Sequence, residues 1–258
     1  MTKKFKIILI ILLILITISN SLLFYLYNFN PLNQFKTNEY QRNIVAKYNL
    51  LKPSSEYLFL ITAIKKIEKS LRIQLIRANS SYAIKKRLTQ KEFEDYASLL
   101  YTYKQLYNID LYAFISNTVA ESFFNKKAYS SKGAIGLNQI MPRTYLWIQY
   151  HVLFHFKVKK SSIYNVYKNT ETALMYWYYN TQLLSKDLDR PPTIKELAYA
   201  YNLGGNATIQ AIKSKKLYDY LPRETIKHGE KVLYYYTNYK NNNFNAFYND
   251  SNFKITNK

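Results

Sequence analysis

The sequence predicts an all-α protein. In most segments after the first fifty residues, apolar side chains recur at the spacing of a helix face. Two capping boxes, Thr89 with Glu92 and Thr193 with Glu196, mark the starts of two helices. We find no convincing alternation of apolar and polar residues of the kind that a half-buried strand shows, and no internal repeat. We therefore expect a helical domain joined by short loops.

Residues 1–28 are predicted to be an N-terminal membrane anchor or signal sequence. Three lysines within the first six residues precede Ile7–Tyr27, an uncharged segment of about 20 residues, long enough to span a bilayer as a transmembrane helix. The lysines favour an N-terminus inside and the remainder outside. A cleaved signal peptide with Ile7–Ile18 as its apolar core is the alternative. The apolar and aromatic stretch Leu22–Tyr27 favours the uncleaved helix, and either reading exports the bulk of the chain.

Residues 29–88 are predicted to form a linker and a helical extension. The polar stretch 28–55 contains two prolines, and a helical period follows over Glu56–Ala78. The apolar stripe of that helix comprises Leu58, Ile61, Ile64, Ile67, Leu71 and Leu75. Much of its other face is basic, with Lys65, Lys66, Lys69 and Arg72. Such a helix either lies on a membrane or wall polymer or packs on the domain, and we favour packing.

Residues 89–240 contain the remaining predicted helices. Several have a recognisable start or stop: Asp110 is an expected N-cap, Pro142 a helix-opening proline, and Gly204 a stop. The predicted helices cover 89–107, 110–121, a short stretch near Arg143, 170–187, 193–203, 207–213 and 224–239. The Asn-rich segment 241–258 is predicted to be a loose tail.

Glu121 is the candidate catalytic residue. It closes the helix that follows Asp110, and no other Asp or Glu occurs from Leu111 to Thr170. At about 100° per residue, Glu121 falls at the edge of the apolar stripe near Phe114, where burial raises the pKa of a carboxyl as a general acid requires. Most glycosidases use a pair of carboxylates, so a catalytic Glu usually has a second Asp or Glu as its partner. A lone Glu beside a Gly-bearing loop therefore suggests that the substrate supplies the second group, although spacing alone also allows a helix-end Glu in water.

Composition narrows the class of partner. The 258 residues allow one domain plus extensions, and 48% hydrophobic residues suffice for a core. The absence of Cys excludes disulfides and a lipid-modified cysteine anchor. The net charge of +21 calls for an anionic partner, whether nucleic acid, anionic lipid or a cell-wall polymer. The 28 Tyr reflect either biased residue usage or, for a few of them, stacking on sugar faces.

Three segments form an ordered set of motifs. The first comprises Glu121-Ser122, Asn125, Ser130, Gly133-Ala134, Gly136-Leu137, Gln139-Ile140-Met141-Pro142 and Thr144. The second is Ala200-Tyr201-Asn202-Leu203-Gly204, and the third is Leu221-Pro222-Arg223-Glu224-Thr225. Together they resemble the lytic transglycosylases of the soluble, goose-lysozyme-like family (SLT domain). The resemblance covers roughly Leu100 to Tyr239.

The chain departs from the family pattern at three places. Asn138 stands where an apolar residue is usual, and Gly205-Asn206 replaces a usual Pro-Gly. His228 stands where a Tyr is common after the Glu-Thr pair. Asn138 and His228 put the lining of the sugar subsites in question, but they leave Glu121 in place.

The resemblance implies a lysozyme-like helical catalytic domain over 89–240 and a peptidoglycan lytic transglycosylase serving cell-wall remodelling. Such an enzyme cleaves between N-acetylmuramic acid and N-acetylglucosamine and forms 1,6-anhydromuramic acid, with one Glu, here Glu121, as acid and then base. By the same resemblance, Ser130, Gln139 and Asn202 would hydrogen-bond the substrate, Met141 and Tyr201 would shape the cleft, and Glu224 would orient sugar or a neighbouring helix. No cofactor is implied.

The expected partners are peptidoglycan strands and, through the N-terminal helix, the membrane, with the catalytic domain outside the cytoplasm. A goose-type lysozyme-like hydrolase is the leading alternative, with Asp110, Glu171 or Glu224 folding back to activate water. A non-catalytic wall-binding or assembly factor is a further alternative, which the intact motif around Glu121 argues against. The sequence does not indicate a protein partner or a larger machine.

Other constellations point to no separate function. His151 and His155 are spaced as metal ligands on a helix, but no third ligand is evident, so no metal site is predicted. Ser122 and Ser130 lack His and Asp partners for a nucleophilic triad. Gly133-x-x-Gly136 is too short for a phosphate loop. The lysines at 213–216 suit a solvated face better than a nucleic-acid groove, and an exported domain seldom meets nucleic acid.

Overall fold

The computed structural model describes residues 55–77, 88–153, 155, 157–214, 217–246 and 248. Its α-helices are α3 (Ser55–Arg77), α4 (Gln90–Tyr107), α5 (Leu111–Ser122), α6 (Pro142–Trp147), α7 (Val166–Leu188), α8 (Ile194–Leu203), α9 (Gly205–Lys213), α10 (Leu217–Tyr220) and α11 (Arg223–Lys240). A π-helical turn, η3 (Ile148–Val152), and a 3-10 turn, η4 (Lys160–Tyr164), complete the described elements. Within these ranges the β-type pairing consists of two isolated bridges, Tyr129 with Ile135 and Ile135 with Ile140. The predicted all-α class is confirmed.

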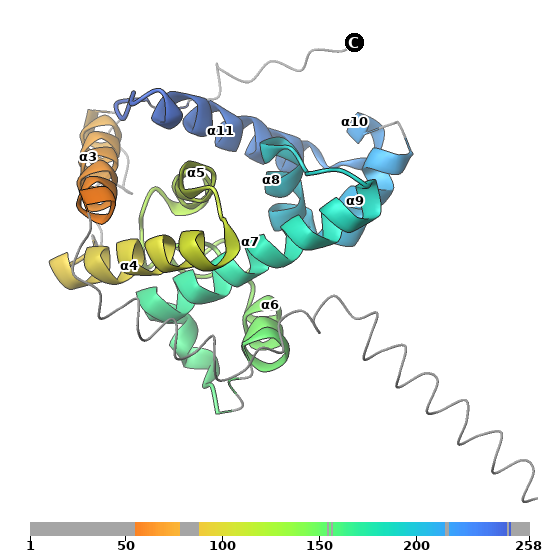
Figure 1. Cartoon of the computed structure of the whole chain (residues 1–258), viewed down its shortest axis with the longest axis horizontal. Helices are drawn as coiled ribbons and strands as arrows, with labels where there is room; N and C mark the ends of the chain where they lie inside the picture. The colour runs from red at the N-terminus through yellow and green to blue at the C-terminus, as the bar shows by residue number, and fades with distance from the viewer. Residues whose placement is uncertain are drawn as a thin grey trace, which may run out of the picture. The chain divides into compact units, whose positions relative to one another are not determined.

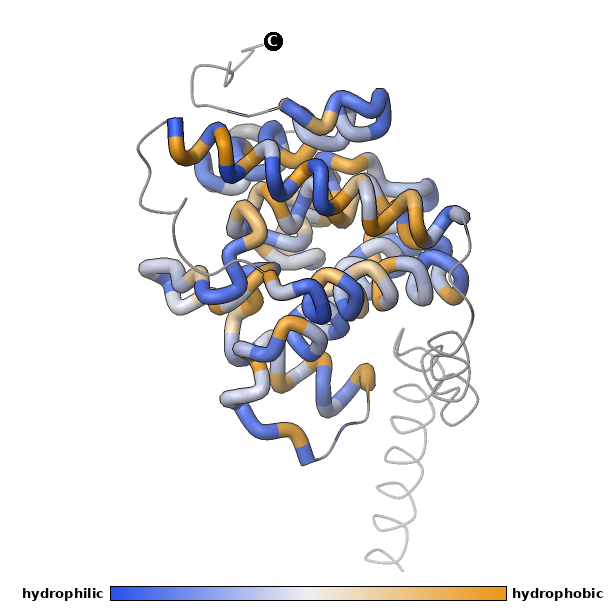
Figure 2. Tube along the Cα trace, turned by 90° about the vertical axis from the view of Figure 1, so that its left-hand side faces the viewer, coloured by the Kyte–Doolittle hydropathy of each residue, from blue (hydrophilic) through white to orange (hydrophobic). Residues whose placement is uncertain are grey.

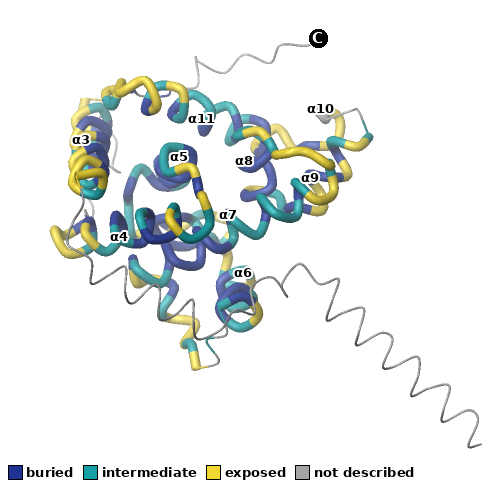
Figure 3. The backbone as a smooth tube through the Cα atoms, viewed as in Figure 1, coloured by how far each residue is buried: buried dark blue, intermediate teal, exposed yellow. Residues whose placement is uncertain are grey.

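Helix α5 lies at the centre of the described helices. Figure 1 shows it framed by α11, α4, α7 and α8, and Figure 3 shows most of its backbone coloured as buried. Its mean hydropathy is high for this chain, and its central residues, from Ala113 to Ala120, are all buried. Helix α11 packs closely on both α5 and α8. Gly229 permits that approach, because a Cβ there would lie 2.2 Å from the Tyr199 ring. The helix that carries Glu121 is therefore held on several sides.

The predicted extension packs on the domain. The ring of Tyr57 in α3 meets Tyr101 of α4 edge to face at 5.9 Å, and Glu56 pairs with Lys104. The buried face of α3 comprises Leu60, Ala63, Ile64, Ile67, Glu68, Ser70, Leu71 and Leu75. Leu58, predicted in the stripe, is about half exposed, because the face turned to the domain runs through Leu60. Figure 2, viewed from the side on which α3 lies, shows hydrophobic and hydrophilic residues interleaved along the helices, as amphipathic packing requires.

Caps set most of the helix boundaries. Both predicted capping boxes are present at α4 and α8, and Asp110 Oδ1 accepts from the Ala113 amide at 3.1 Å. Helix α7 begins at Val166, earlier than the predicted Thr170, because Asn165 caps it by accepting from the Lys168 amide. The turns η3, η4 and α10 were not predicted, since segments of four or five residues are too short to show a helical period.

The first part of the Asn-rich segment is not a loose tail. Ala246 and Tyr248 are buried, and the Tyr248 amide donates to the Tyr235 hydroxyl of α11 at 3.2 Å. Aromatic burial against α11 therefore overrides the polar composition up to Tyr248. The described residues contain no helix that is both long and apolar enough to cross a membrane. The predicted anchor Ile7–Tyr27, the polar linker before α3 and residues 249–258 lie outside the described residues.

Candidate active site

Helix α5 delivers Glu121 to the site. The helix ends one residue later at Ser122, and Phe123 follows in the left-handed conformation with φ 51°. The Ser122 hydroxyl donates to the Leu137 carbonyl at 2.6 Å, which fastens the end of α5 to the following loop. The Glu121 side chain is only 13% exposed, as its place at the edge of the apolar stripe predicted.

The loop that follows α5 is held by its own backbone. Ser130 and Ala134 exchange hydrogen bonds, in which the Ser130 amide donates to the Ala134 carbonyl and the Ala134 amide donates to the Ser130 hydroxyl. Gln139 has φ 46°, and its Nε2 donates to the Gly136 carbonyl at 2.9 Å. A glycine is required at 136, because φ is +81° and a Cβ would lie 2.7 Å from Asn169 Nδ2.

Asn138 anchors the loop to the core. It is fully buried; its Oδ1 accepts from the Thr118 hydroxyl at 2.7 Å, and its amide donates to Asn169 Oδ1 at 2.9 Å. Asn169 Nδ2 in turn donates to the Ile135 and Ile163 carbonyls. The expectation that Asn138 affects the sugar-subsite lining is wrong, since its side chain joins this internal network instead of lining the cleft.

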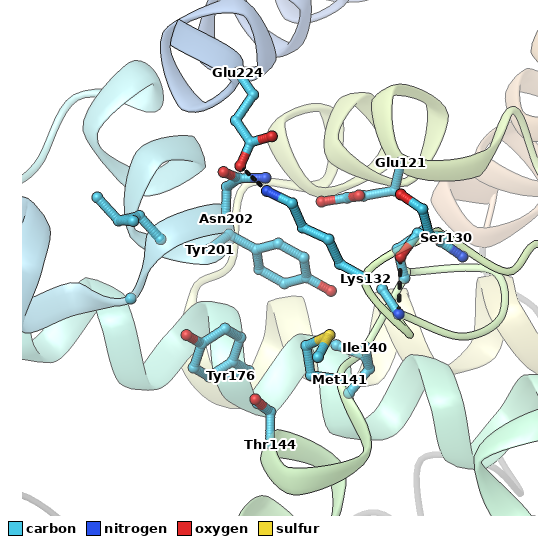
Figure 4. A pocket seen from close by; sticks show the side chains of 15 residues that line it. Glu121, Ser130, Lys132, Ile140, Met141, Thr144, Tyr176, Tyr201, Asn202 and Glu224 are labelled. Carbon is cyan, nitrogen blue, oxygen red and sulfur yellow. Dashed lines mark hydrogen bonds and ion pairs between the residues drawn. The ribbon is translucent and has the colours of Figure 1, made fainter. Parts of the chain in front are cut away.

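All seven candidate residues line one cleft of about 580 Å³ (Figure 4). The predicted members are Glu121, Ser130, Gln139, Met141, Tyr201, Asn202 and Glu224. The further lining residues are Ser131, Lys132, Ala134, Ile140, Thr144, Tyr176, Leu203 and Gly204. The cleft is thus built from the end of α5, the loop before α6, the end of α8 and the start of α11, with Thr144 from α6 and Tyr176 from α7.

The surroundings of Glu121 favour its protonated form. Burial raises the pKa of this carboxyl to about 8, against a smaller opposite effect of the Lys231 ammonium group. Lys231 Nζ donates to the Ala120 carbonyl at 2.7 Å. His228 Nε2 lies 3.4 Å from Glu121 Oε1, and burial, aided by Lys231, lowers the pKa of His228 to about 3. At neutral pH the site therefore holds a protonated Glu121 beside a neutral imidazole.

Tyr201 closes the inner wall of the cleft. Its hydroxyl donates to the Asn138 carbonyl at 2.8 Å, and its ring packs against Tyr176 and Trp177. Burial, with the nearby Glu121 carboxyl, raises the pKa of Tyr201 well above its ordinary value, so the hydroxyl keeps its proton. The hydroxyl is thus engaged with the loop that carries Gln139.

The outer part of the cleft is polar and exposed. Asn202 Oδ1 accepts from the Thr225 hydroxyl at 2.7 Å, which ties the end of α8 to the start of α11. The exposed Glu224 carboxylate pairs with Lys132, and Figure 4 shows this pair reaching across the cleft. An exposed ion pair of this kind contributes little stability, at most about 1 kcal/mol, so a ligand can displace it easily.

The other acids proposed to activate water are occupied elsewhere. Asp110 caps α5 and accepts from the Tyr236 hydroxyl at 3.0 Å. Glu171 pairs with Lys168 at 2.8 Å and lies 4.0 Å from His155. Neither lines the cleft. Among the described residues, no group of three or more His, Asp or Glu is placed to hold a metal ion.

Sequence reasoning missed several contributors. Lys132, Thr144 and Tyr176 line the cleft, and His228 and Lys231 surround the Glu121 carboxyl. His228 was visible as a departure from the family pattern. Lys231 lies three residues later on the same helix face, but no signal in the sequence indicates that this face turns toward α5.

Comparison with protein families gives one match. Residues 98–222 match the family model of the transglycosylase SLT domain, which confirms the predicted resemblance over that range. Six of the seven candidate residues fall within it, and Glu224 lies two positions beyond its end. No curated protein matches the chain.

Proposed function

We propose that the chain is a peptidoglycan lytic transglycosylase, because residues 98–222 match the family model of the transglycosylase SLT domain, which supports an action on peptidoglycan. It cleaves between N-acetylmuramic acid and N-acetylglucosamine and leaves 1,6-anhydromuramic acid, as an enzyme of cell-wall remodelling. The observation that carries the proposal is the single largely buried carboxyl in the cleft, Glu121, with a pKa raised to about 8. Such a group donates a proton at neutral pH.

In the first step, Glu121 gives its proton to the glycosidic oxygen. The bond from that oxygen to C1 of the muramic acid breaks, and its electron pair stays with the leaving N-acetylglucosamine. The substrate's own acetamido group stabilises the positive charge at C1, as in other substrate-assisted glycosidases. No enzyme nucleophile is needed.

In the second step, the Glu121 carboxylate takes the proton of the C6 hydroxyl of the same sugar while O6 bonds to C1. This step returns Glu121 to its protonated form and closes the 1,6-anhydro ring. The raised pKa suits both steps, because a group with a pKa near the working pH can donate and accept a proton with similar ease.

Ser130, Gln139 and Asn202 are proposed to hydrogen-bond the sugars, and Met141 and Tyr201 to shape the cleft. Met141 is 42% exposed, which leaves its side chain available for a sugar face. The Glu224 carboxylate accepts a hydrogen bond from a sugar hydroxyl once the substrate has displaced Lys132 from its ion pair.

The placement of the acids favours this reaction over hydrolysis. Glu224 is the other carboxylate among the cleft-lining residues, and it is exposed and paired with Lys132. A water-activating base needs to lie within reach of the water it deprotonates, and Asp110 and Glu171 are engaged outside the cleft. A goose-type hydrolase is thus the weaker candidate, and a non-catalytic wall-binding factor has no need of a buried acid in its cleft.

We also propose that the enzyme works outside the cytoplasm, attached to the membrane by Ile7–Tyr27. The supporting observations are the length and apolarity of that segment, the three lysines before it and the location of peptidoglycan beyond the membrane.

The test is digestion of purified peptidoglycan by the wild-type chain and by Glu121→Gln. General acid catalysis contributes on the order of 10²–10⁴ in rate, so the Gln variant is expected to lose at least about a hundredfold. Anhydromuropeptides from the wild type, identified by mass spectrometry, support the proposal. A Gln variant that keeps more than about a tenth of the activity contradicts the role of Glu121.

A further inference from the structure

His228 projects from the first turns of α11 toward the end of α5. Its side chain is only 9% exposed, and its Nε2 lies 3.1 Å from Asn117 Oδ1 and 3.4 Å from Glu121 Oε1. Asn117 and Glu121 are one helical turn apart on α5, so one imidazole nitrogen faces both. We propose that His228 is a positioning residue, whose Nε2–H holds Asn117 Oδ1 and Glu121 Oε1 and so directs Glu121 Oε2, with its proton, into the cleft. This inference rests on the proposed function of Glu121 as the acid and base.

The two distances define the bonding. At 3.1 Å, the contact with Asn117 is an ordinary N–H···O hydrogen bond. The separation of 3.4 Å from Glu121 Oε1 is not a hydrogen bond in this structure, and the proposal is that it tightens into one when substrate is bound, as catalytic hydrogen bonds often do. With Asn117 Oδ1 as the acceptor, the proposal places the hydrogen of the neutral imidazole on Nε2. A neutral donor is what this position requires, since it can serve Glu121 in both its protonated and its ionised form.

Burial first, and the Lys231 ammonium group second, keep the imidazole neutral. Glu121 faces it from α5, and Lys231 lies one turn further along α11. Tyr201 of α8 faces Glu121 with a hydroxyl that keeps its proton. Lys231 is held against the Ala120 carbonyl and over the Phe123 ring, at 4.2 Å from the ring centroid. An imidazolium ion would therefore be buried beside an ammonium group, an arrangement that electrostatics disfavours.

In the proposed role, His228 keeps its proton and donates the same hydrogen bond in both steps of the reaction. While Glu121 is protonated, the Nε2–H bond to Oε1 leaves Oε2–H free to reach the glycosidic oxygen. After the proton has been transferred, the same N–H stabilises the carboxylate that must next accept the C6 hydroxyl proton. In the proton-donating step, where Glu121 is protonated, loss of this donor removes one hydrogen bond between neutral groups, worth about 0.5–1.5 kcal/mol, or roughly 2- to 12-fold in rate.

The kinetic test compares His228→Phe with His228→Gln on the full chain, with His151→Gln as the control. Phe keeps the ring volume and removes the donor, whereas the Gln amide can supply an N–H near the place of Nε2. His151 is exposed on η3, outside the cleft. We expect the Phe variant to lose about 3- to 10-fold in kcat with little change in KM, and the Gln variant to keep most of its kcat.

The pH profile separates positioning from packing. A hydrogen bond to the carboxylate stabilises its charged form and lowers its pKa. Removing the donor therefore raises the pKa of Glu121, and the alkaline limb of the kcat profile moves to higher pH in the Phe variant alone. A Phe variant with the wild-type kcat and pH profile, or a Gln variant as impaired as the Phe variant, overturns the proposal.

A second measurement does not depend on activity. Long-range ¹H–¹⁵N correlation of the three histidine rings in the ¹⁵N-labelled full chain reports their tautomers. We expect the His228 ring to stay neutral from pH 5 to 8, with its hydrogen on Nε2. A ring with its hydrogen on Nδ1, or one that titrates near its ordinary pKa of about 6.5, overturns the assignment. If the wild type fails to cleave peptidoglycan, the proposed function fails, and this spectrum still decides the geometry at His228.

Discussion

Glu121 is placed where an ionised carboxylate is disfavoured. Its side chain is almost buried at the end of α5, and the pKa of about 8 is far above the ordinary value of 4.5. The folded protein holds this proton up to about pH 8, whereas the unfolded chain releases it near pH 4.5. Between those values the folded state binds more protons, so the contribution of Glu121 to stability falls as the pH rises.

This linkage predicts the stability of Glu121→Gln. Below about pH 4.5 the Glu121 carboxyl is protonated in both the folded and the unfolded wild type. The variant and the wild type are therefore expected to unfold at similar urea concentrations. Above pH 8 the variant is expected to be more stable than the wild type by on the order of 3–5 kcal/mol, because it has no charge to bury. Urea unfolding of both proteins at pH 4 and pH 9 measures the difference. A difference that does not change with pH contradicts the raised pKa.

Tyr201→Phe tests the role of the Tyr201 hydroxyl. The hydroxyl donates to the Asn138 carbonyl, and Phe would leave that buried carbonyl short of a partner. We expect the free energy of unfolding to fall by about 1 kcal/mol and kcat/KM to fall severalfold, because the loop carrying Gln139 and Met141 is then held less firmly. For the stability measurement alone, Tyr176→Phe is the matched control, since its hydroxyl makes a longer bond, 3.4 Å, to the Ala200 carbonyl. Full activity and stability in Tyr201→Phe would show that the hydroxyl does neither job.

At the scale of elements, the loop between α5 and α6 depends on close backbone packing. Gly136→Ala forces a Cβ to within 2.7 Å of Asn169 Nδ2, in addition to the strain of φ +81°. Gly133→Ala carries a similar strain at φ +88°, but its Cβ would meet only the Tyr129 hydroxyl at 3.8 Å.

We therefore expect Gly136→Ala to lower the free energy of unfolding by about 1–3 kcal/mol more than Gly133→Ala does, because overpacking adds to backbone strain. Thermal or urea unfolding of the two variants provides the comparison. Equal losses would mean that Asn169 moves aside without cost, and that the loop does not depend on this contact.

The sequence predicts the helices with strong local signals and misses those without them. Thr89 and Thr193 begin capping boxes, and both helices start where those boxes place them. Helix α7 starts earlier than predicted because Asn165 caps it, and an Asn in a polar stretch gives a weak signal. The composition of 241–258 suggests a tail. Tyr248 is nevertheless buried, because it packs on α11, and the composition of a segment does not show such a contact.

In the candidate site too, residues with a local sequence signal were predicted and residues without one were missed. Glu121 and the residues of the three motifs were identified from spacing and resemblance, and they meet in one cleft. The two residues beside the Glu121 carboxyl, His228 and Lys231, come from more than a hundred positions away. Only the packing of α11 on α5 brings them there, and one sequence does not specify which face of α11 turns inward.

At the scale of the whole molecule, the proposed location depends on residues 1–28. We expect the segment Ile7–Tyr27 to remain in the mature protein and to hold it in the membrane, because Leu22–Tyr27 suits a membrane interface. N-terminal sequencing of the mature protein, combined with membrane fractionation, checks this. A mature N-terminus near Leu22 would instead show a cleaved signal peptide and a released enzyme.

The central claim is that one carboxyl, Glu121, and the substrate's own C6 hydroxyl complete the reaction without water. Intramolecular attack has an effective molarity of up to roughly 10⁵ M or more when well oriented, which favours ring closure in a cleft without a dedicated water-activating acid. Digestion of peptidoglycan in ¹⁸O-labelled water, followed by mass spectrometry, tests this most directly. We expect unlabelled 1,6-anhydromuramic acid ends and no new reducing ends, whereas ¹⁸O at C1 of the muramic acid would identify a hydrolase and overturn the proposed reaction.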